Sequence, residues 1–246
     1  MTRQRADLVL VAQGLATSRA RAQAEIAAGH VSCAGRVIAK ANEMLDPDAA
    51  LVVTDACPYV SRGGLKLAHA LDAFGIHPAG LTVLDLGAST GGFCDCLLQR
   101  GAAKIYAVDV GHGQLHEKIR NDPRVVNLEG TDARDLAPTL FAEAVPLVTA
   151  DLSFIALEKV LGSALDLAAP GADLIALVKP QFEVGRANIG KGGIVRDAGA
   201  RQAALSRVKA WIGARSGWQV AGETASPISG GDGNEEYLIA ARKTKE

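Results

Sequence analysis

The stretch Thr82-Val-Leu-Asp-Leu-Gly-Ala-Ser-Thr-Gly-Gly-Phe93 decides the fold that this sequence predicts. It begins with a β-branched and apolar run that is typical of a buried strand, turns at Gly87, and opens a helix at Gly91 and Gly92. Because glycine has no Cβ, a ligand can lie directly against the backbone of such a turn. The stretch therefore predicts a ligand-binding loop, and the alternative is an ordinary strand-to-helix turn of an α/β domain.

The glycine spacing of this loop argues against two common cofactor motifs. A dinucleotide fingerprint needs G-x-G-x-x-G, whereas three other residues separate Gly87 from Gly91. A P-loop would end in G-K-[ST], which the stretch lacks. The pattern D-x-G-x-x-x-G-G-F resembles instead the first motif of S-adenosylmethionine-dependent methyltransferases. That resemblance implies S-adenosylmethionine as cofactor, with these candidate binding residues in the loop: Asp85, Gly87, Ser89, Thr90, Gly91, Gly92 and Phe93.

Strand and helix patterns alternate from Leu81 onward, which predicts a parallel sheet with helices on both faces. An acidic residue stands at the end of each of the first four strands, where ligands of such sheets bind. Asp109 is placed to accept hydrogen bonds from ribose hydroxyls, and Asp132 is placed to meet the adenine amino group, although each could simply cap a helix or a turn. The four residues are Asp85, Asp109, Asp132 and Asp151, and the seven expected strands lie at 83–86, 105–109, 125–128, 147–150, 174–178, 219–223 and 237–241.

The composition narrows the class of protein. With 246 residues and 48% apolar residues, the chain suits one large domain or a medium one with a small appendage. The formal net charge of −1 indicates no global field for a polyanionic partner. We expect a cytoplasmic protein without a membrane segment, because no apolar run of about 18 residues and no secretion signal is visible.

No metal site is expected, since the four cysteines lack zinc spacing and His112 and His116 have no third ligand nearby.

The first 55 residues have a pattern of their own, which changes from helical to extended. Two short helices are expected between residues 5 and 29, separated by Gly14, and the second begins at the N-cap Ser18. A tight hairpin is expected at 31–38 and a further strand at 51–53. The motifs Arg5-x-Asp7, Leu15-Ala-x-Ser18-Arg19, Gly29-His30-Val31 and Gly35-Arg36-Val37 closely resemble the S4 RNA-binding domain.

This resemblance implies that basic side chains of the second helix and of the hairpin bind folded RNA through phosphate and shape contacts. The basic residues before residue 41 face only Asp7 and Glu25, whereas Glu43 opens what reads as a separate acidic segment. The alternative is that these arginines only solvate a small helical cap. The candidates for RNA binding are Arg5, Arg19, Arg21, Arg36 and Lys40, together with Arg62.

A boundary between two domains is expected at Cys57-Pro58, which interrupts any regular element. The expected organisation is an S4-like domain at 1–55, a linker at 56–60 and a methyltransferase domain at 61–246.

Four ionisable residues in separate motifs indicate the type of methyltransferase. Lys66 stands in Ser-Arg-Gly-Gly-Leu-Lys, Asp151 in Ala-Asp-Leu-Ser-Phe, Lys179 in Val-Lys-Pro-Gln-Phe-Glu and Glu236 in Asn-Glu-Glu-Tyr. In order and context they resemble the K-D-K-E tetrad of RrmJ/FtsJ-like ribose 2′-O-methyltransferases. With the S4-like domain in front, nearly the whole chain is similar to the TlyA family of rRNA cytidine 2′-O-methyltransferases, which are also known as haemolysins.

The TlyA resemblance implies methyl transfer to a cytidine 2′-oxygen of ribosomal RNA, in the 23S molecule alone or in both the 23S and the 16S molecules. It implies that Lys179 holds and deprotonates the hydroxyl. We expect that Lys66 assists by like-charge repulsion, and that Asp151 and Glu236 orient the two ammonium groups. The alternative is a pair of structural salt bridges at the sheet edge.

A polar, glycine-rich stretch at 185–196 follows the fifth strand and is expected to be a mobile substrate loop. Its candidates for RNA binding are Arg186, Lys191 and Arg196, although a plain surface loop is equally compatible with the pattern. Two rival functions remain at this point. One is a haemolysin-like, membrane-active protein, and the other is a non-catalytic module that binds rRNA or the ribosomal subunit.

Overall fold

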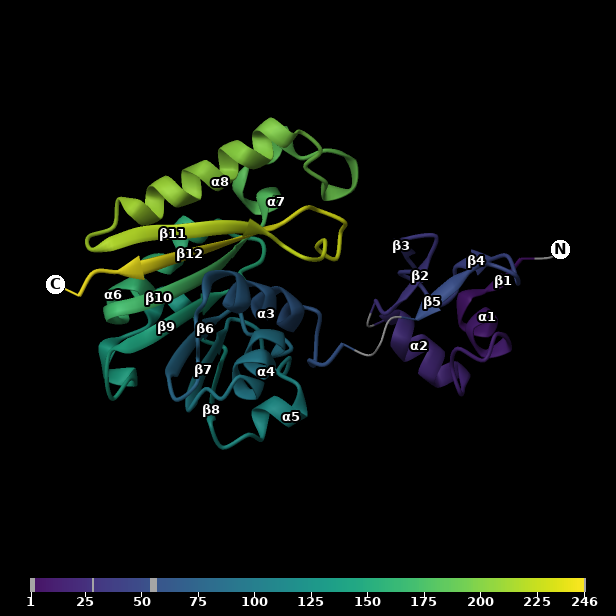
Figure 1. Ribbon diagram of the computed structural model, residues 1–246, viewed down its shortest axis with the longest axis horizontal. Helices are drawn as coiled ribbons and strands as arrows, with labels where there is room; N and C mark the ends of the chain where they lie inside the picture. Colours follow the sequence, from purple (N-terminus) through teal and green to yellow (C-terminus); the bar gives the residue numbers. More distant parts are fainter. Residues whose placement is uncertain (1–2, 28, 54–56, 246) are drawn as a thin grey trace. The chain divides into compact units, whose positions relative to one another are not determined.

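The structure is a computed structural model that describes residues 3–27, 29–53 and 57–245 of the chain. It divides into two compact units, Met1–Arg62 and Gly63–Glu246, which are described separately (Figure 1). The predicted domains and linker include residues that lie outside the described ones, among them 1–2, 54–56 and 246. The predicted linker at 56–60 therefore stays a prediction.

The smaller unit is an α+β domain that contains the two helices, the hairpin and the strand expected, and a further pair of short strands, Gln4–Arg5 and Met44–Leu45, that was not expected. Ser18 Oγ accepts a hydrogen bond from the Arg21 amide at 3.1 Å, as an N-cap should. The hairpin turns through Ala34 and Gly35 with φ of 50° and 77°, the paired left-handed conformation of a two-residue hairpin turn. Its helices are α1 (Ala6–Ala12) and α2 (Arg19–Ala27), and its strands are β1 (Gln4–Arg5), β2 (Val31–Cys33), β3 (Arg36–Val37), β4 (Met44–Leu45) and β5 (Leu51–Val53).

The larger unit is built on a seven-stranded sheet with the strand order β11-β12-β10-β9-β6-β7-β8. All seven strands predicted from the sequence are confirmed. They are β6 (Thr82–Leu86), β7 (Lys104–Asp109), β8 (Val125–Glu129), β9 (Val145–Ala150), β10 (Ala168–Val178), β11 (Trp218–Ala225) and β12 (Tyr237–Lys243).

The prediction of a parallel sheet is wrong for the last strand, because β12 runs antiparallel to both β10 and β11. No helix separates β11 from β12, and a chain that returns without a crossover can only run antiparallel. The strand returns into the gap between β10 and β11, so the start of β12 lies beside the end of β10 (Figure 1).

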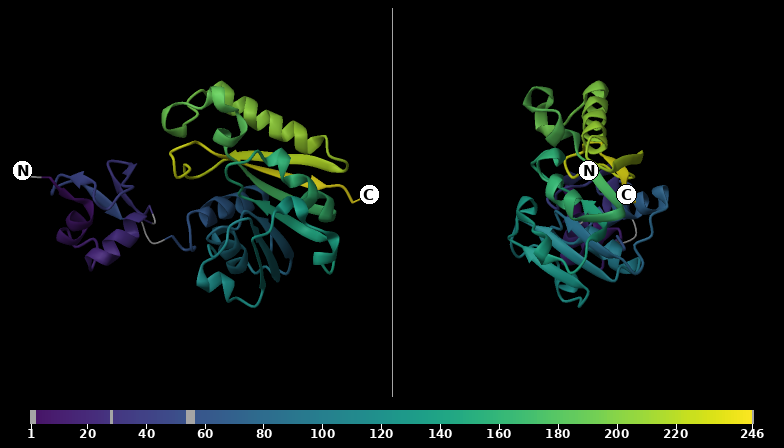
Figure 2. Two further views of the ribbon diagram at one scale, coloured as in Figure 1. Left: turned by 180° about the vertical axis from the view of Figure 1, so that it is seen from behind. Right: turned by 90° about the vertical axis from the view of Figure 1, so that its left-hand side faces the viewer.

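Helices cover both faces of the sheet, as expected (Figures 1 and 2). α6 (Leu161–Leu167) and α8 (Ala198–Gly213) share one buried core with the sheet, which includes Leu84, Val148 and Ile239. α3 (Gly63–Phe74) and α4 (Gly92–Gln99) pack against each other on the opposite face. The short helices are α5 (Glu117–Arg120) and α7 (Pro180–Glu183), with 3-10 turns at Ala133–Asp135, Pro138–Leu140, Leu157–Lys159, Arg186–Asn188 and Lys191–Gly193.

None of the helices formed by the described residues has the length and apolar character needed to cross a membrane.

Candidate active site

The loop between β6 and α4 has the tight backbone that its glycines predicted. Gly87 has φ of 77°, and a Cβ at this position would lie 2.5 Å from the carbonyl oxygen of Asp151. Gly91 has φ of 91° and forms the N-terminal cap of α4. Ser89 is also left-handed, with φ of 45°, which is uncommon for a residue with a side chain. The backbone at Gly87 therefore excludes every larger residue and leaves its edge open to a ligand.

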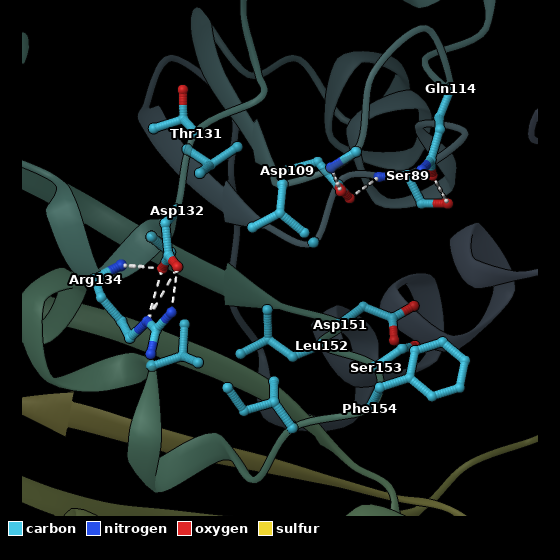
Figure 3. A pocket seen from close by; sticks show the side chains of 17 residues that line it. Ser89, Asp109, Gln114, Thr131, Asp132, Arg134, Asp151, Leu152, Ser153 and Phe154 are labelled. Atoms are coloured by element: carbon cyan, nitrogen blue, oxygen red, sulfur yellow. Dashed lines mark hydrogen bonds and ion pairs between the residues drawn. The ribbon is translucent and has the colours of Figure 1, made fainter.

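A cavity of about 560 Å³ opens at the carboxyl ends of β6, β7, β8 and β9 (Figure 3). This is where a sheet of this type binds its ligand. Of the ten candidate cofactor residues, five line the cavity, namely Gly87, Ser89, Asp109, Asp132 and Asp151. Among the described residues of the cavity wall, the other five do not appear: Asp85, Thr90, Gly91, Gly92 and Phe93.

Asp109 fixes one side of the cavity through backbone amides. Its Oδ2 accepts a hydrogen bond from the Ser89 amide at 2.8 Å, and its Oδ1 accepts one from the Gly111 amide at 2.7 Å. The carboxylate therefore ties the end of β7 to the glycine loop (Figure 3). Each carboxylate oxygen keeps further lone pairs, so Asp109 can still accept hydrogen bonds from a ligand.

Asp132 lies on the other side of the cavity (Figure 3). It caps the 3-10 turn that follows β8 by accepting a hydrogen bond from the Arg134 amide at 2.9 Å. The Arg134 guanidinium also binds this carboxylate and lowers the pKa of Asp132 to about 2. Asp132 is therefore an ionised acceptor at neutral pH.

Asp85 lies inside the protein beneath the loop rather than at its surface. The side chain is completely buried, and it accepts hydrogen bonds from Thr149 Oγ1 at 2.7 Å and from Cys94 Sγ at 3.0 Å. Burial raises the pKa of Asp85 to about 7, because it disfavours the charged carboxylate and neither of these two contacts is a cation that would stabilise it. Its contacts join β6, β9 and α4 just below Gly87.

Lys179 and Asp151 form the first half of the predicted tetrad. Lys179 Nζ lies 2.6 Å from Asp151 Oδ1 and donates a hydrogen bond to Ser153 Oγ at 2.8 Å. Asp151 and Ser153 both line the cavity, so the lysine ammonium lies at the cavity edge. No role was predicted for Ser153, although it stands in the quoted Ala-Asp-Leu-Ser-Phe motif.

Lys66 and Glu236 form the second half. Lys66 Nζ, near the beginning of α3, binds Glu236 Oε2, and both side chains are almost fully buried. Val178 pairs with Tyr237 across β10 and β12, so the next residues, Lys179 and Glu236, are neighbours at the strand ends. Directly opposed residues of antiparallel strands have Cα atoms about 5 Å apart. The structure thus brings both ion pairs to one edge of the sheet.

Phe154 and Glu183 were not predicted as site residues. Phe154 lines the cavity with 90% of its surface exposed and has φ of 65°. Its ring packs at a tilt against that of Phe182, with the ring centroids 5.1 Å apart. Glu183 is buried; its Oε1 accepts a hydrogen bond from the Leu157 amide at 2.9 Å, and its Oε2 binds Arg207 at 2.9 Å. Glu183 therefore joins the segment that carries Asp151 to the one that carries Lys179. Only the local motifs could have drawn attention to these residues.

The candidate RNA-binding residues of the larger unit, Arg186, Lys191 and Arg196, are all exposed on the segment 185–196. This segment is also attached at an internal position, where Asn234 Nδ2 donates a hydrogen bond to the Gly193 carbonyl at 3.0 Å. Within the described residues, no group of three histidine, cysteine, aspartate or glutamate side chains is arranged to hold a metal ion.

Most candidate RNA-binding arginines of the smaller unit are bound to carboxylates. Arg5 and Arg19 both bind the fully buried Asp7, each at 3.0 Å, and Arg21 binds Glu25.

The expectation that the acidic residues after residue 41 form a separate segment is wrong. Arg36 of the hairpin binds Glu43, because the chain folds back and brings the two side chains together. Lys40 is exposed, and Arg62 lies against Gly29.

Comparisons with known proteins agree with both units. The family model of FtsJ-like methyltransferases matches residues 59–243, and that of the S4 domain matches residues 4–51. The chain is 48% identical to the protein named 16S/23S rRNA (cytidine-2′-O)-methyltransferase TlyA of Mycobacterium tuberculosis, over 98% of this chain and 90% of that one.

Two solved structures are similar as well. A Streptococcus thermophilus protein assigned to the hemolysins is 39% identical, with a TM-score of 0.77 over 100% of this chain and 90% of that one. The O-methyltransferase of Bacillus cereus, solved in complex with SAH, is 18% identical with a TM-score of 0.51, over 77% of this chain and 83% of that one. At this identity the likeness shows the fold alone, which is that of S-adenosylmethionine-dependent methyltransferases. The chain as a whole therefore belongs to the TlyA family of FtsJ-like methyltransferases, with an S4 domain at its N-terminus.

Proposed function

We propose that this protein transfers a methyl group from S-adenosylmethionine to the 2′-oxygen of a cytidine in ribosomal RNA. The observation that carries the proposal is that two lysine–carboxylate pairs lie at neighbouring strand ends, and that Asp151 of one pair lines the cavity beside Gly87. The similarity to the Mycobacterium tuberculosis protein, whose name states this reaction, supports the choice of cytidine and of rRNA.

The cavity has the features that S-adenosylmethionine requires. The backbone of Gly87 lines the cavity and lies against the amino-acid end of the cofactor. Asp109 is the acceptor for the ribose hydroxyls, and the ionised Asp132 is the acceptor for the adenine amino group. When bound, the cofactor supplies a methyl group that its sulfonium has already activated. The protein's own residues then have to align the acceptor oxygen and remove one proton.

Lys179 is the residue proposed to remove that proton. Its Nζ lies at the cavity edge between Asp151 and Ser153, within reach of a hydroxyl placed in the cavity. In its neutral form Nζ accepts the proton of the 2′-hydroxyl. Asp151 fixes the amine, while Glu236, which lies beside Lys179 at the end of the neighbouring strand, holds Lys66 of α3.

The smaller unit is proposed to bind ribosomal RNA. Arg19, Arg21, Arg36 and Lys40 project from α2 and from the segment around the hairpin, where S4-type domains present basic groups to RNA phosphates. A ribosomal substrate places the activity in the cytoplasm.

Mapping of ribose methylation tests the function directly. The purified protein is incubated with labelled S-adenosylmethionine and with each ribosomal subunit, and the 2′-O-methylated nucleotides of both rRNAs are then identified by mass spectrometry. We expect one methylated cytidine in 23S rRNA, and the same reaction shows whether 16S rRNA is a further substrate. A Lys179→Ala protein that kept full activity would remove the assignment of the base, and a wild-type protein without activity would remove the function.

A further inference from the structure

A buried side chain, that of Asn234, helps to attach the exposed segment 185–196 to the rest of the larger unit. Asn234 is only 1% exposed, although it lies in the loop between β11 and β12. Its Oδ1 accepts a hydrogen bond from the Val195 amide at 2.9 Å, and its Nδ2 donates one to the Gly193 carbonyl at 3.0 Å. Because both polar atoms of the amide are used, the position of this segment depends on the position of Asn234.

Asn234 is linked to Glu236, two residues further along the chain, through the turn at Gly230. The Gly230 amide donates a hydrogen bond to the Asn234 carbonyl at 2.9 Å, and a Cβ at position 230 would lie 2.5 Å from Glu236 Oε1. The Ser226 amide holds the Glu236 carbonyl at 2.9 Å. A displacement of Asn234 would therefore move Glu236, which in turn holds Lys66.

Helix α8 joins the same two segments a second time. Arg201 donates hydrogen bonds from one guanidinium nitrogen to the Val195 and Arg196 carbonyls, at 3.0 and 2.9 Å. Its other terminal nitrogen lies 3.0 Å from Glu235 Oε2. Residues 193–196 and 234–235 are thus joined by both Asn234 and Arg201.

We propose that Asn234 is a positioning residue that couples the binding of RNA on residues 190–196 to the placement of Glu236 and Lys66. The inference rests on the proposed function, because that function supplies an RNA substrate for the exposed candidate residues Lys191 and Arg196 of this segment. Asn234 does not act on the substrate itself, since its side chain is buried and both polar atoms are occupied. Without Asn234, RNA can still bind, but its binding no longer sets the lysine–carboxylate pairs.

The test compares Asn234→Ala with Asn188→Ala. Asn188 is the matched control, because it lies in the same segment and its exposed amide bonds only locally, to the carbonyl of Val184 just before the segment, at 3.0 Å. We expect Asn234→Ala to lower the single-turnover methylation rate at saturating ribosomal subunit by at least about tenfold, as misplacement of reacting groups does. The calorimetric affinity for S-adenosylmethionine should change by less than about twofold, and Asn188→Ala should match the wild type.

A double-mutant cycle separates positioning from a merely structural role. If Asn234 acts through Glu236, Asn234→Ala should slow a Glu236→Gln protein much less than it slows the wild type. Fully multiplicative losses, or a rate equal to that of Asn188→Ala, would overturn the proposal. Should the alanine variant fail to fold, Asn234→Asp decides instead, because it keeps the acceptor for Val195 and loses only the donor to Gly193. An Asp variant as fast as the wild type overturns the coupling, and an inactive wild type overturns the proposed function instead.

Discussion

Replacing Asp85 by asparagine should change how the stability of the larger unit depends on pH. Asp85 is completely buried, and its pKa is raised to about 7 from an unfolded value of 3.8. Folding therefore favours the protonated acid. The stabilising contribution of the proton is fully present below pH 3.8 and is lost as the pH rises through about 7. A shift of roughly 3 units at about 1.36 kcal/mol each gives a loss of about 4 kcal/mol across this range.

An asparagine side chain does not titrate, so the Asp85→Asn protein should lack this loss. Relative to the wild type, it should gain about 4 kcal/mol of unfolding free energy between pH 4 and pH 8. Any hydrogen bond that the amide loses to Thr149 or Cys94 shifts the whole curve by a constant and leaves its slope unchanged. The slope is therefore the quantity that reports on the buried proton.

Urea unfolding followed by tryptophan fluorescence is a suitable assay, because both tryptophans, Trp211 and Trp218, belong to the larger unit. Asp72→Asn is the control. The Arg100 guanidinium lowers the pKa of Asp72, so its contribution is lost only as the pH falls below about 4. Parallel curves for the wild type and Asp85→Asn between pH 4 and pH 8 would refute the reasoning.

Three further changes test the site. Gly87→Ala should weaken S-adenosylmethionine binding by at least about tenfold, because the new methyl group would collide with the Asp151 carbonyl and displace the loop. Calorimetric titration measures this affinity, and an unchanged affinity would contradict the assignment of Gly87 to the cofactor site. Ser153→Ala removes the hydrogen bond to Lys179 and should lower the methylation rate by about tenfold without changing cofactor affinity; an unchanged rate would show that the serine does not fix the amine. Glu183→Gln weakens the bond to Arg207 and should cost about 2 kcal/mol of unfolding free energy. Glu158→Gln is the control and should cost less than about 1 kcal/mol, because Glu158 forms an exposed ion pair with Arg207 at 3.9 Å. Equal losses would argue against a stabilising role of the buried Glu183–Arg207 contact.

The sequence was sufficient to locate the strands, and to propose the tetrad, because both depend on local patterns. Apolar runs bounded by turn residues mark each strand, and Lys66, Asp151, Lys179 and Glu236 stand in short motifs that can be read one at a time. Contacts between distant residues are not encoded in this way. The pair of Arg36 with Glu43 contradicts the apparent separation of basic and acidic segments, since it depends on how the chain returns after the hairpin.

Burial was the second property that the sequence could not supply. Asp85 and Asp109 both end apolar strands and look equivalent in the sequence, yet one lies beneath the loop and the other lines the cavity. The register between the two strands decides this. Asp85 pairs with Ala107, so Asp109 lies two residues, or about 7 Å, further toward the carboxyl edge of the sheet.

The strand whose direction was predicted wrongly is the one that assembles the tetrad. Neighbouring strands lie about 4.8 Å apart, so β12 between β10 and β11 places Glu236 one strand spacing from Lys179. Had β12 been added outside β11, the two residues would lie about 10 Å apart, and Lys66 bound to Glu236 would be withdrawn by the same distance. A parallel β12 would place Glu236, which precedes the strand, at the opposite end of the sheet from the cavity. The antiparallel insertion is thus the geometric condition that brings the two ion pairs, from distant parts of the chain, to one edge of the sheet.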